Sequence, residues 1–124
     1  MKKTAILTIL IIFFSTGLLA QFGSQDSGGK LSPFQACYDV KFYDINLTID
    51  LNEKAIGGSV VMLARAVNDF NKILVDLDGR YRIDAIQSIS DGNKTTDLKF
   101  YRDSNKVWID FPETIKIGKF FTTK

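Results

Sequence analysis

The chain has 124 residues, enough for one small domain, and carries 16 basic and 14 acidic residues with a formal net charge of +2. It contains no histidine and a single cysteine, which excludes the usual base of serine and cysteine hydrolases, imidazole ligands for catalytic zinc and a thiolate zinc site. The near balance of charge argues against nucleic-acid binding, which requires excess positive charge to displace phosphate counterions.

The chain begins with the features of a secretory signal peptide. Lys2 and Lys3 form a basic start, and residues 5–14 are almost wholly apolar. This apolar run is shorter than the roughly 20 residues that span a membrane. We expect cleavage after Ala20, with Gly17 as an alternative end; an uncleaved membrane anchor is the other interpretation. Cleavage leaves a chain of balanced charge that is exported to the periplasm or the extracellular space and has no membrane span.

The remaining sequence divides into a leader and one folded domain. After the signal peptide of residues 1–20, residues 21–33 are rich in Gly and Ser and are expected to form a flexible leader. Residues 34–124 are expected to fold. Cys37 has no partner in this chain, so it is either buried and inert or paired with a cysteine on sequence that is not present here.

The first predicted strand is long and two-faced. From position 43 to position 51, apolar residues alternate with polar ones. Val40 and Phe42 are out of phase with this set, which indicates a bulge or a strand buried on both faces near its start. A turn at Asn52-Glu53-Lys54 leads to a second strand over residues 56–67. Gly57-Gly58 at the beginning of that strand indicates a bulge or the close approach of another backbone.

Further strand and turn signals follow to the last residue. Residues 73–77 alternate into the turn signal Asp78-Gly79, and residues 81–89 are predicted to form a strand that ends at Asp91-Gly92-Asn93. Residues 98–101 and 107–111 flank Asp103-Ser104-Asn105 as a hairpin. Residues 115–124 read as the start of another strand.

This spacing predicts an all-β fold. Turn signals recur about every 10 to 14 residues without a helical run between them, which is typical of an antiparallel sandwich or barrel. We expect little or no helix after the signal peptide. Because the last strand has no terminating turn, we expect the domain to be incomplete, the front part of a longer protein.

Carboxylates are the remaining candidates for chemistry. Asp76, Asp78 and Asp84 lie close in sequence, and Asp110 and Glu113 flank a proline, so a glycosidase-like pair or a calcium site can be imagined. A solvated turn is the favoured interpretation, because Asp before Gly is common in turns for backbone reasons. We therefore expect no catalytic, cofactor-binding or metal-binding residue in this chain.

The hydrophobic pattern as a whole resembles a known domain. Residues 38–51, Ile56-Gly57-Gly58-Ser59-Val60, and the segments 73–77 and 83–86 resemble the early strands of the N-terminal domain of zinc aminopeptidases of the aminopeptidase N type, members of the gluzincin metallopeptidases. The resemblance covers about residues 38–121. It implies a saddle-like β-sandwich that packs against a thermolysin-like catalytic domain and helps to wall its active site.

The resemblance places the family's chemistry outside this chain. The Gly-Ala-Met-Glu-Asn segment that holds the substrate amino terminus and the His-Glu-x-x-His zinc helix belong to the next domain, so no functional residue is carried over. On this reading the chain alone is inert, zinc and peptide substrates belong to the full-length protein, and the catalytic domain of the same polypeptide is the partner. A stand-alone exported β-sandwich that binds glycan or protein is the alternative, and a small hydrolase that uses carboxylates is a third reading.

Overall fold

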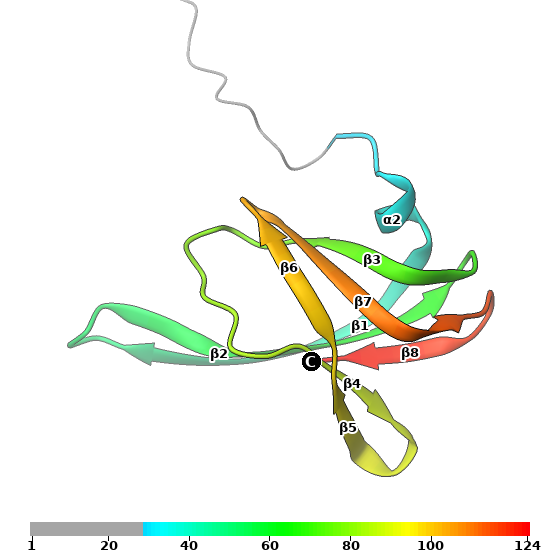
Figure 1. The fold of residues 1–124 in the computed structure, drawn as a ribbon. Helices are drawn as coiled ribbons and strands as arrows, with labels where there is room; N and C mark the ends of the chain where they lie inside the picture. Colours follow the sequence, from blue (N-terminus) through cyan, green and yellow to red (C-terminus); the bar gives the residue numbers. More distant parts are fainter. Residues whose placement is uncertain (1–28) are drawn as a thin grey trace, which may run out of the picture.

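The computed structural model describes residues 29–124, which form two antiparallel β-sheets and one short helix (Figure 1). The expectation of an antiparallel all-β fold with little helix is confirmed. The predicted signal peptide and most of the predicted leader lie outside the described residues. The elements are α2 (Pro33–Ala36), β1 (Tyr38–Asp50), β2 (Ala55–Ala66), β3 (Phe70–Asp76), β4 (Gln87–Ser90), the 3-10 turn η2 (Asp91–Asn93), β5 (Lys94–Asp97), β6 (Lys99–Asp103), β7 (Lys106–Ile115) and β8 (Phe120–Thr123).

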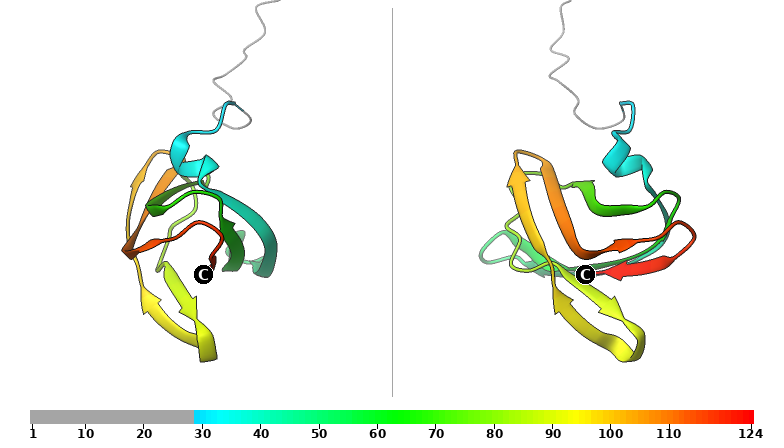
Figure 2. Two further views of the ribbon diagram at one scale, coloured as in Figure 1. Left: turned by 90° about the vertical axis from the view of Figure 1, so that its right-hand side faces the viewer. Right: turned by 45° about the vertical axis from the view of Figure 1, so that its right-hand side comes forward.

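The eight strands are divided between a larger and a smaller sheet. The larger sheet has the order β1-β2-β8-β4-β5, and the smaller has the order β3-β7-β6. In both views of Figure 2 the hairpin β4–β5 projects away from the rest of the molecule. Between residues 29 and 124 the structure contains no helix long and apolar enough to cross a membrane.

The first hairpin follows the predicted pattern closely. β1 pairs with β2 along its length, and the pairing register shifts between Val40 and Phe42, so the predicted bulge is confirmed with Lys41 as the extra residue. The predicted turn is also confirmed. A side-chain oxygen of Asp50 accepts hydrogen bonds from the backbone N–H groups of Asn52 and Glu53 at 2.9 and 3.0 Å, which closes the loop between the strands.

Gly58 confirms the predicted close approach of two backbones. Its φ of 145° is one that residues with a side chain rarely adopt, and a Cβ there would overlap with the backbone carbonyl of Asn46 on β1. Gly57, the preceding residue, has no atom within 4 Å of the position that a Cβ would occupy. Position 58 therefore requires glycine, whereas position 57 has room for a Cβ.

We expect Gly58→Ala to lower the free energy of local opening of the hairpin by roughly 2 kcal/mol or more, because the positive φ and the overlap with Asn46 both disfavour alanine. Faster amide hydrogen exchange in the outer half of β1 and β2, measured by NMR, checks this. Gly57→Ala is the matched control and should leave exchange almost unchanged. Equal effects from both substitutions would contradict this account of Gly58.

One core joins the two sheets. Ala64 and Ala66 of β2 and Ile73 of β3 are almost fully buried, as is Val107 of β7. They pack in one cluster with the aromatic residues Phe70, Phe111 and Phe121, whose rings meet edge to face with centroids 5.2–5.6 Å apart. The body of the domain is therefore built on contacts between strands that are distant in sequence.

The prediction of a strand over residues 81–89 is wrong for most of its length. Only β4, Gln87–Ser90, pairs with other strands; residues 81–86 form an irregular connection that passes from the smaller sheet to the larger one. Ile83 and Ile86 contact the core from this connection, so their apolar character reflects anchoring of a loop. β5, whose residues are all exposed, was not predicted, because it has no apolar alternation.

Candidate functional surfaces

Three of the candidate carboxylates each contact one neighbouring side chain. Asp76 accepts a hydrogen bond of 2.8 Å from Gln35, Asp84 pairs with Arg82 at 2.8 Å, and Asp110 pairs with Lys72 at 3.1 Å. Glu113 is exposed on β7. Within residues 29–124 the structure gathers no group of three or more His, Cys, Asp or Glu side chains that could hold a metal ion.

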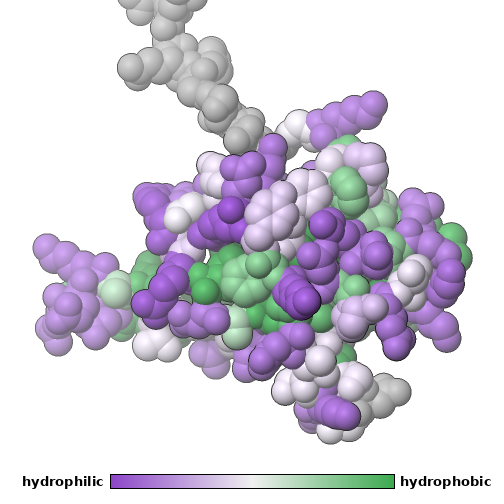
Figure 3. Space-filling model, viewed as in Figure 1, coloured by the Kyte–Doolittle hydropathy of each residue, from purple (hydrophilic) through white to green (hydrophobic). Residues whose placement is uncertain are grey.

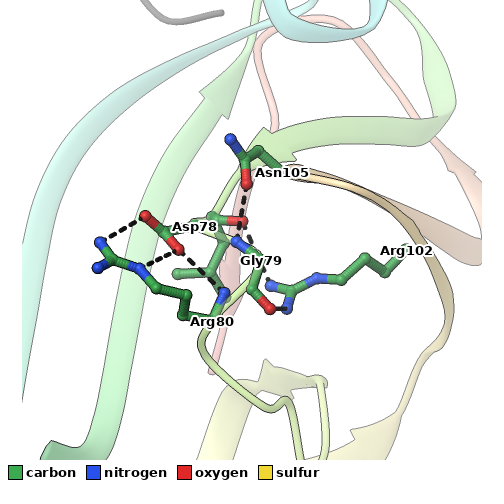
Figure 4. Close-up of polar contacts among 6 residues, drawn as sticks. Asp78, Gly79, Arg80, Arg102 and Asn105 are labelled. Carbon is green, nitrogen blue, oxygen red and sulfur yellow. Dashed lines mark hydrogen bonds and ion pairs between the residues drawn. The ribbon is translucent and has the colours of Figure 1, made fainter.

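The surroundings of Asp78 lower the pKa of its carboxyl strongly. It caps the turn after β3 by accepting hydrogen bonds from the Arg80 side chain at 2.9 and 3.0 Å and from the Arg80 backbone N–H at 2.9 Å (Figure 4). The Arg80 side chain is the main cause and its backbone N–H the next, and together they lower the pKa of Asp78 from 3.8 to about 2. These contacts close a turn at Asp78-Gly79, which is the interpretation that the sequence favoured.

We expect the Asp78 carboxyl to titrate at about pH 2 by NMR, because the three hydrogen bonds from Arg80 favour its charged form. Its folded-state pKa is depressed, so its contribution to stability is present above the unfolded value and is lost as the pH falls toward 2. Arg80→Gln should raise the pKa toward 3.8. Arg82→Gln, which removes the partner of Asp84, should leave the Asp78 pKa unchanged; a midpoint of Asp78 already near 3.8 in the unaltered chain contradicts the assignment.

Arg102 fixes the connection that follows this turn. Its guanidinium donates to the backbone carbonyls of Leu77, Gly79 and Tyr81. Beside it, Asn105 accepts a hydrogen bond of 2.7 Å from the Gly79 N–H (Figure 4). Arg102 Nε is buried with no hydrogen-bond partner among the described residues. An arginine that satisfies three carbonyls lets residues 77–81 leave β3 without a strand partner, so the chain enters the irregular connection of residues 81–86 from a fixed turn.

Cys37 is buried, as the favoured interpretation predicts. Cys37 is 5% exposed, its Sγ lies 3.4 Å from the Phe34 carbonyl oxygen, and burial raises the pKa of its thiol. Its own backbone carbonyl accepts hydrogen bonds from the N–H groups of Val67 and Asn68. The cysteine therefore sits in a packed junction between α2, β1 and the end of β2, and thiol chemistry there is disfavoured.

An exposed apolar region lies on the hairpin β1–β2. Opposite residues of the two strands point to one face, and this face carries six partly exposed side chains that we call the hairpin surface. Three of them, Ile45, Leu47 and Ile49, are 58–64% exposed. In Figure 3, hydrophobic atoms lie between the hydrophilic tip of this hairpin and the body. The six are Tyr43, Ile45, Leu47, Ile49, Ile56 and Val60.

The strand edges beside the hairpin surface are also unpaired within the described residues. β1 is the edge strand of the larger sheet. On the other side of β2, β8 pairs with residues 62–65 and does not extend along the outer part of β2. The outer part of β2, residues 55–61, thus has β1 on one side and no described strand on the other. The sequence predicted the apolar face of this strand; alternation alone could not show that no described side chain covers it.

Comparison with known proteins identifies no relative. No protein-family model and no curated protein matches the chain. Its function has to be argued from the sequence pattern and from the surfaces described above.

Proposed function

We propose that this chain is the non-catalytic N-terminal β domain of an exported zinc aminopeptidase of the aminopeptidase N type, the front part of a longer protein. In this proposal the two sheets belong to a saddle-like β-sandwich that packs against the catalytic domain and helps to wall its active site. The strand pattern over residues 38–121 and the exposed hairpin surface support it. Alone, the domain removes no residues from peptides.

The hairpin surface is the observation that carries the proposal. Monomeric soluble proteins rarely expose large contiguous apolar patches, and natural sheets protect their edges. Here the apolar side chains of Ile45, Leu47 and Ile49 lie beside two strand edges that no described strand pairs. Because both backbone and side-chain groups are left without partners in the described residues, this surface suits a large, permanent contact with another part of the same polypeptide better than a transient one.

The zinc of such an enzyme does not fit the residues of this chain. The sequence has no histidine, and residues 29–124 hold no cluster of potential metal ligands. A metallopeptidase requires the metal, a water and a base in one preorganised cluster. The proposal therefore assigns zinc and substrate chemistry to the catalytic domain, and assigns to this chain only the packing surface.

The DNA that follows the codon of Lys124 tests the proposal. The expected result is a reading frame that continues, with allowance for one frameshift or contig end, into Gly-Ala-Met-Glu-Asn and His-Glu-x-x-His. A true stop codon followed by unrelated sequence contradicts it.

Export is tested separately, by amino-terminal sequencing of the chain from the extracytoplasmic fraction. We expect the mature chain to begin at Gln21, or at Leu18 if cleavage follows Gly17. A chain that keeps Met1 and sediments with membranes would show instead that the apolar segment is an anchor.

A further inference from the structure

The outer face of the smaller sheet carries a pair of aromatic rings that the hairpin surface does not include. Val107 and Ile109 of β7 point into the core, so Trp108 between them points outward. Its cross-strand partner on β6 is Tyr101, which is 52% exposed. The hairpin β6–β7 therefore presents two aromatic side chains next to each other on a face turned away from the core.

The surroundings of Trp108 hold this pair in place. The rings of Tyr101 and Trp108 are parallel, with 5° between their planes and 6.1 Å between their centroids. Phe34 of α2 meets Trp108 edge to face at 5.0 Å, and Leu74, the partner of Trp108 on β3, is 3% exposed. Because Trp108 is fixed by these contacts, Tyr101 stacked on it is a preorganised, solvent-facing ring.

Charged residues border the aromatic pair with equal numbers of each sign. The register of β3, β7 and β6 places one row of three charged residues on each side of the row that contains Trp108. Each row holds both signs, and together they contain three lysines and three aspartates. The rows are Lys72, Asp110 and Lys99 on one side, and Asp76, Lys106 and Asp103 on the other.

A balanced border selects against charged ligands. A nucleic acid or an acidic glycan requires a net positive surface, and a basic peptide requires a net negative one. A neutral sugar instead has an apolar ring face that packs on an aromatic ring, and a rim of hydroxyls that both donate and accept hydrogen bonds. Lysine donors and aspartate acceptors at strand spacing match such a rim on both sides of the ring. Asp76 already bonds Gln35, and Lys72 already pairs with Asp110, so Lys99, Lys106 and Asp103 are the first partners for the hydroxyls.

We propose that the outer face of β3, β7 and β6 is a binding site for neutral oligosaccharides, with a sugar ring stacked on Tyr101 and its hydroxyls bonded to the flanking lysines and aspartates. The site lies on the smaller sheet, whereas the hairpin surface lies on the larger one. The proposed oligosaccharide site therefore does not depend on the proposed peptidase assignment.

The single tryptophan of the sequence makes the test direct, because all tryptophan fluorescence comes from Trp108. The chain, expressed with its own amino terminus and purified as the host processes it, is titrated with cellohexaose, chitohexaose or maltohexaose. The expected result is a saturable change of Trp108 emission with at least one of them, within about 10 mM, where a site of millimolar affinity is largely filled. No change with any of the three overturns the proposal.

Two variants locate the site. Tyr101→Ala should weaken binding about tenfold or more, the loss of one aromatic stacking contact. Tyr43→Ala is the matched control, since Tyr43 is 51% exposed on the other sheet, and it should bind like the unaltered chain. Equal losses in both variants overturn the assignment to this face, as does a stronger response to heparin or to single-stranded DNA. If Tyr101→Ala does not fold by circular dichroism, Asp103→Ala on the exposed border takes its place, and unchanged binding there counts against the proposal.

Discussion

Phe121→Ala is expected to lower the free energy of unfolding by about 3–5 kcal/mol, a large part of the stability of a small domain. Phe121 lies 8% exposed on the short strand β8, and its ring meets those of Phe70, Phe111 and Tyr38 edge to face, at 5.2, 5.5 and 6.1 Å. Removing a buried phenylalanine ring costs about 3–5 kcal/mol, against a total stability of about 5–15 kcal/mol for a domain. Urea unfolding followed by circular dichroism measures the loss.

The neighbouring residue provides a matched control. Phe120 is on the same strand, is 61% exposed and points to the other face of the sheet. Phe120→Ala should therefore change the stability by no more than about 0.5–1 kcal/mol. If the two alanine substitutions have the same effect, Phe121 does not join the two sheets in the way described.

Replacing the apolar centre of the hairpin surface should change association far more than folding. In the triple variant Ile45→Thr, Leu47→Thr and Ile49→Thr, threonine places a β-branched side chain that suits a strand at each position and removes apolar surface. Because these side chains are 58–64% exposed, we expect the melting transition to remain cooperative. Binding of a hydrophobic dye and self-association should fall by about half or more, as measured by fluorescence and sedimentation.

The opposite face of the same strand serves as the control for this variant. Asp44 and Thr48 alternate with the apolar residues of β1 and are exposed. Asp44→Ser with Thr48→Ser should leave dye binding unchanged. Loss of the folded state in the threonine variant, or dye binding equal to that of the unaltered chain, would show that the hairpin surface is already covered in solution.

Much of the fold follows from local chemistry. A bulge near Val40 and Phe42, the turn at Asn52-Glu53-Lys54 and a close approach at Gly57-Gly58 were each among the predicted alternatives, because period-two alternation makes a one-residue shift visible. The structure identifies Lys41 as the extra residue and Gly58 as the point of contact. The strand predicted over residues 81–89 was wrong for residues 81–86, and the reason is non-local. The sequence near that segment does not show that Arg102, about 20 residues further on, bonds to the carbonyl of Tyr81 at its start.

The surfaces were less predictable than the strands. The apolar alternation of β1 was visible, but whether it faces a core depends on strands elsewhere in the chain. The aromatic pair was missed although a signal existed. The predicted hairpin around Ser104 fixes which residues face each other, and that register brings Tyr101 next to Trp108.

The mass of the native polypeptide that contains this chain shows whether the chain is one domain of a larger enzyme. Extracytoplasmic proteins of the source cells are separated by size, and each fraction is searched by mass spectrometry for peptides from residues 34–124. We expect these peptides to occur in a much larger polypeptide, together with peptides from a His-Glu-x-x-His segment. Peptides found only in a species no larger than the 13.9 kDa of this chain would contradict it.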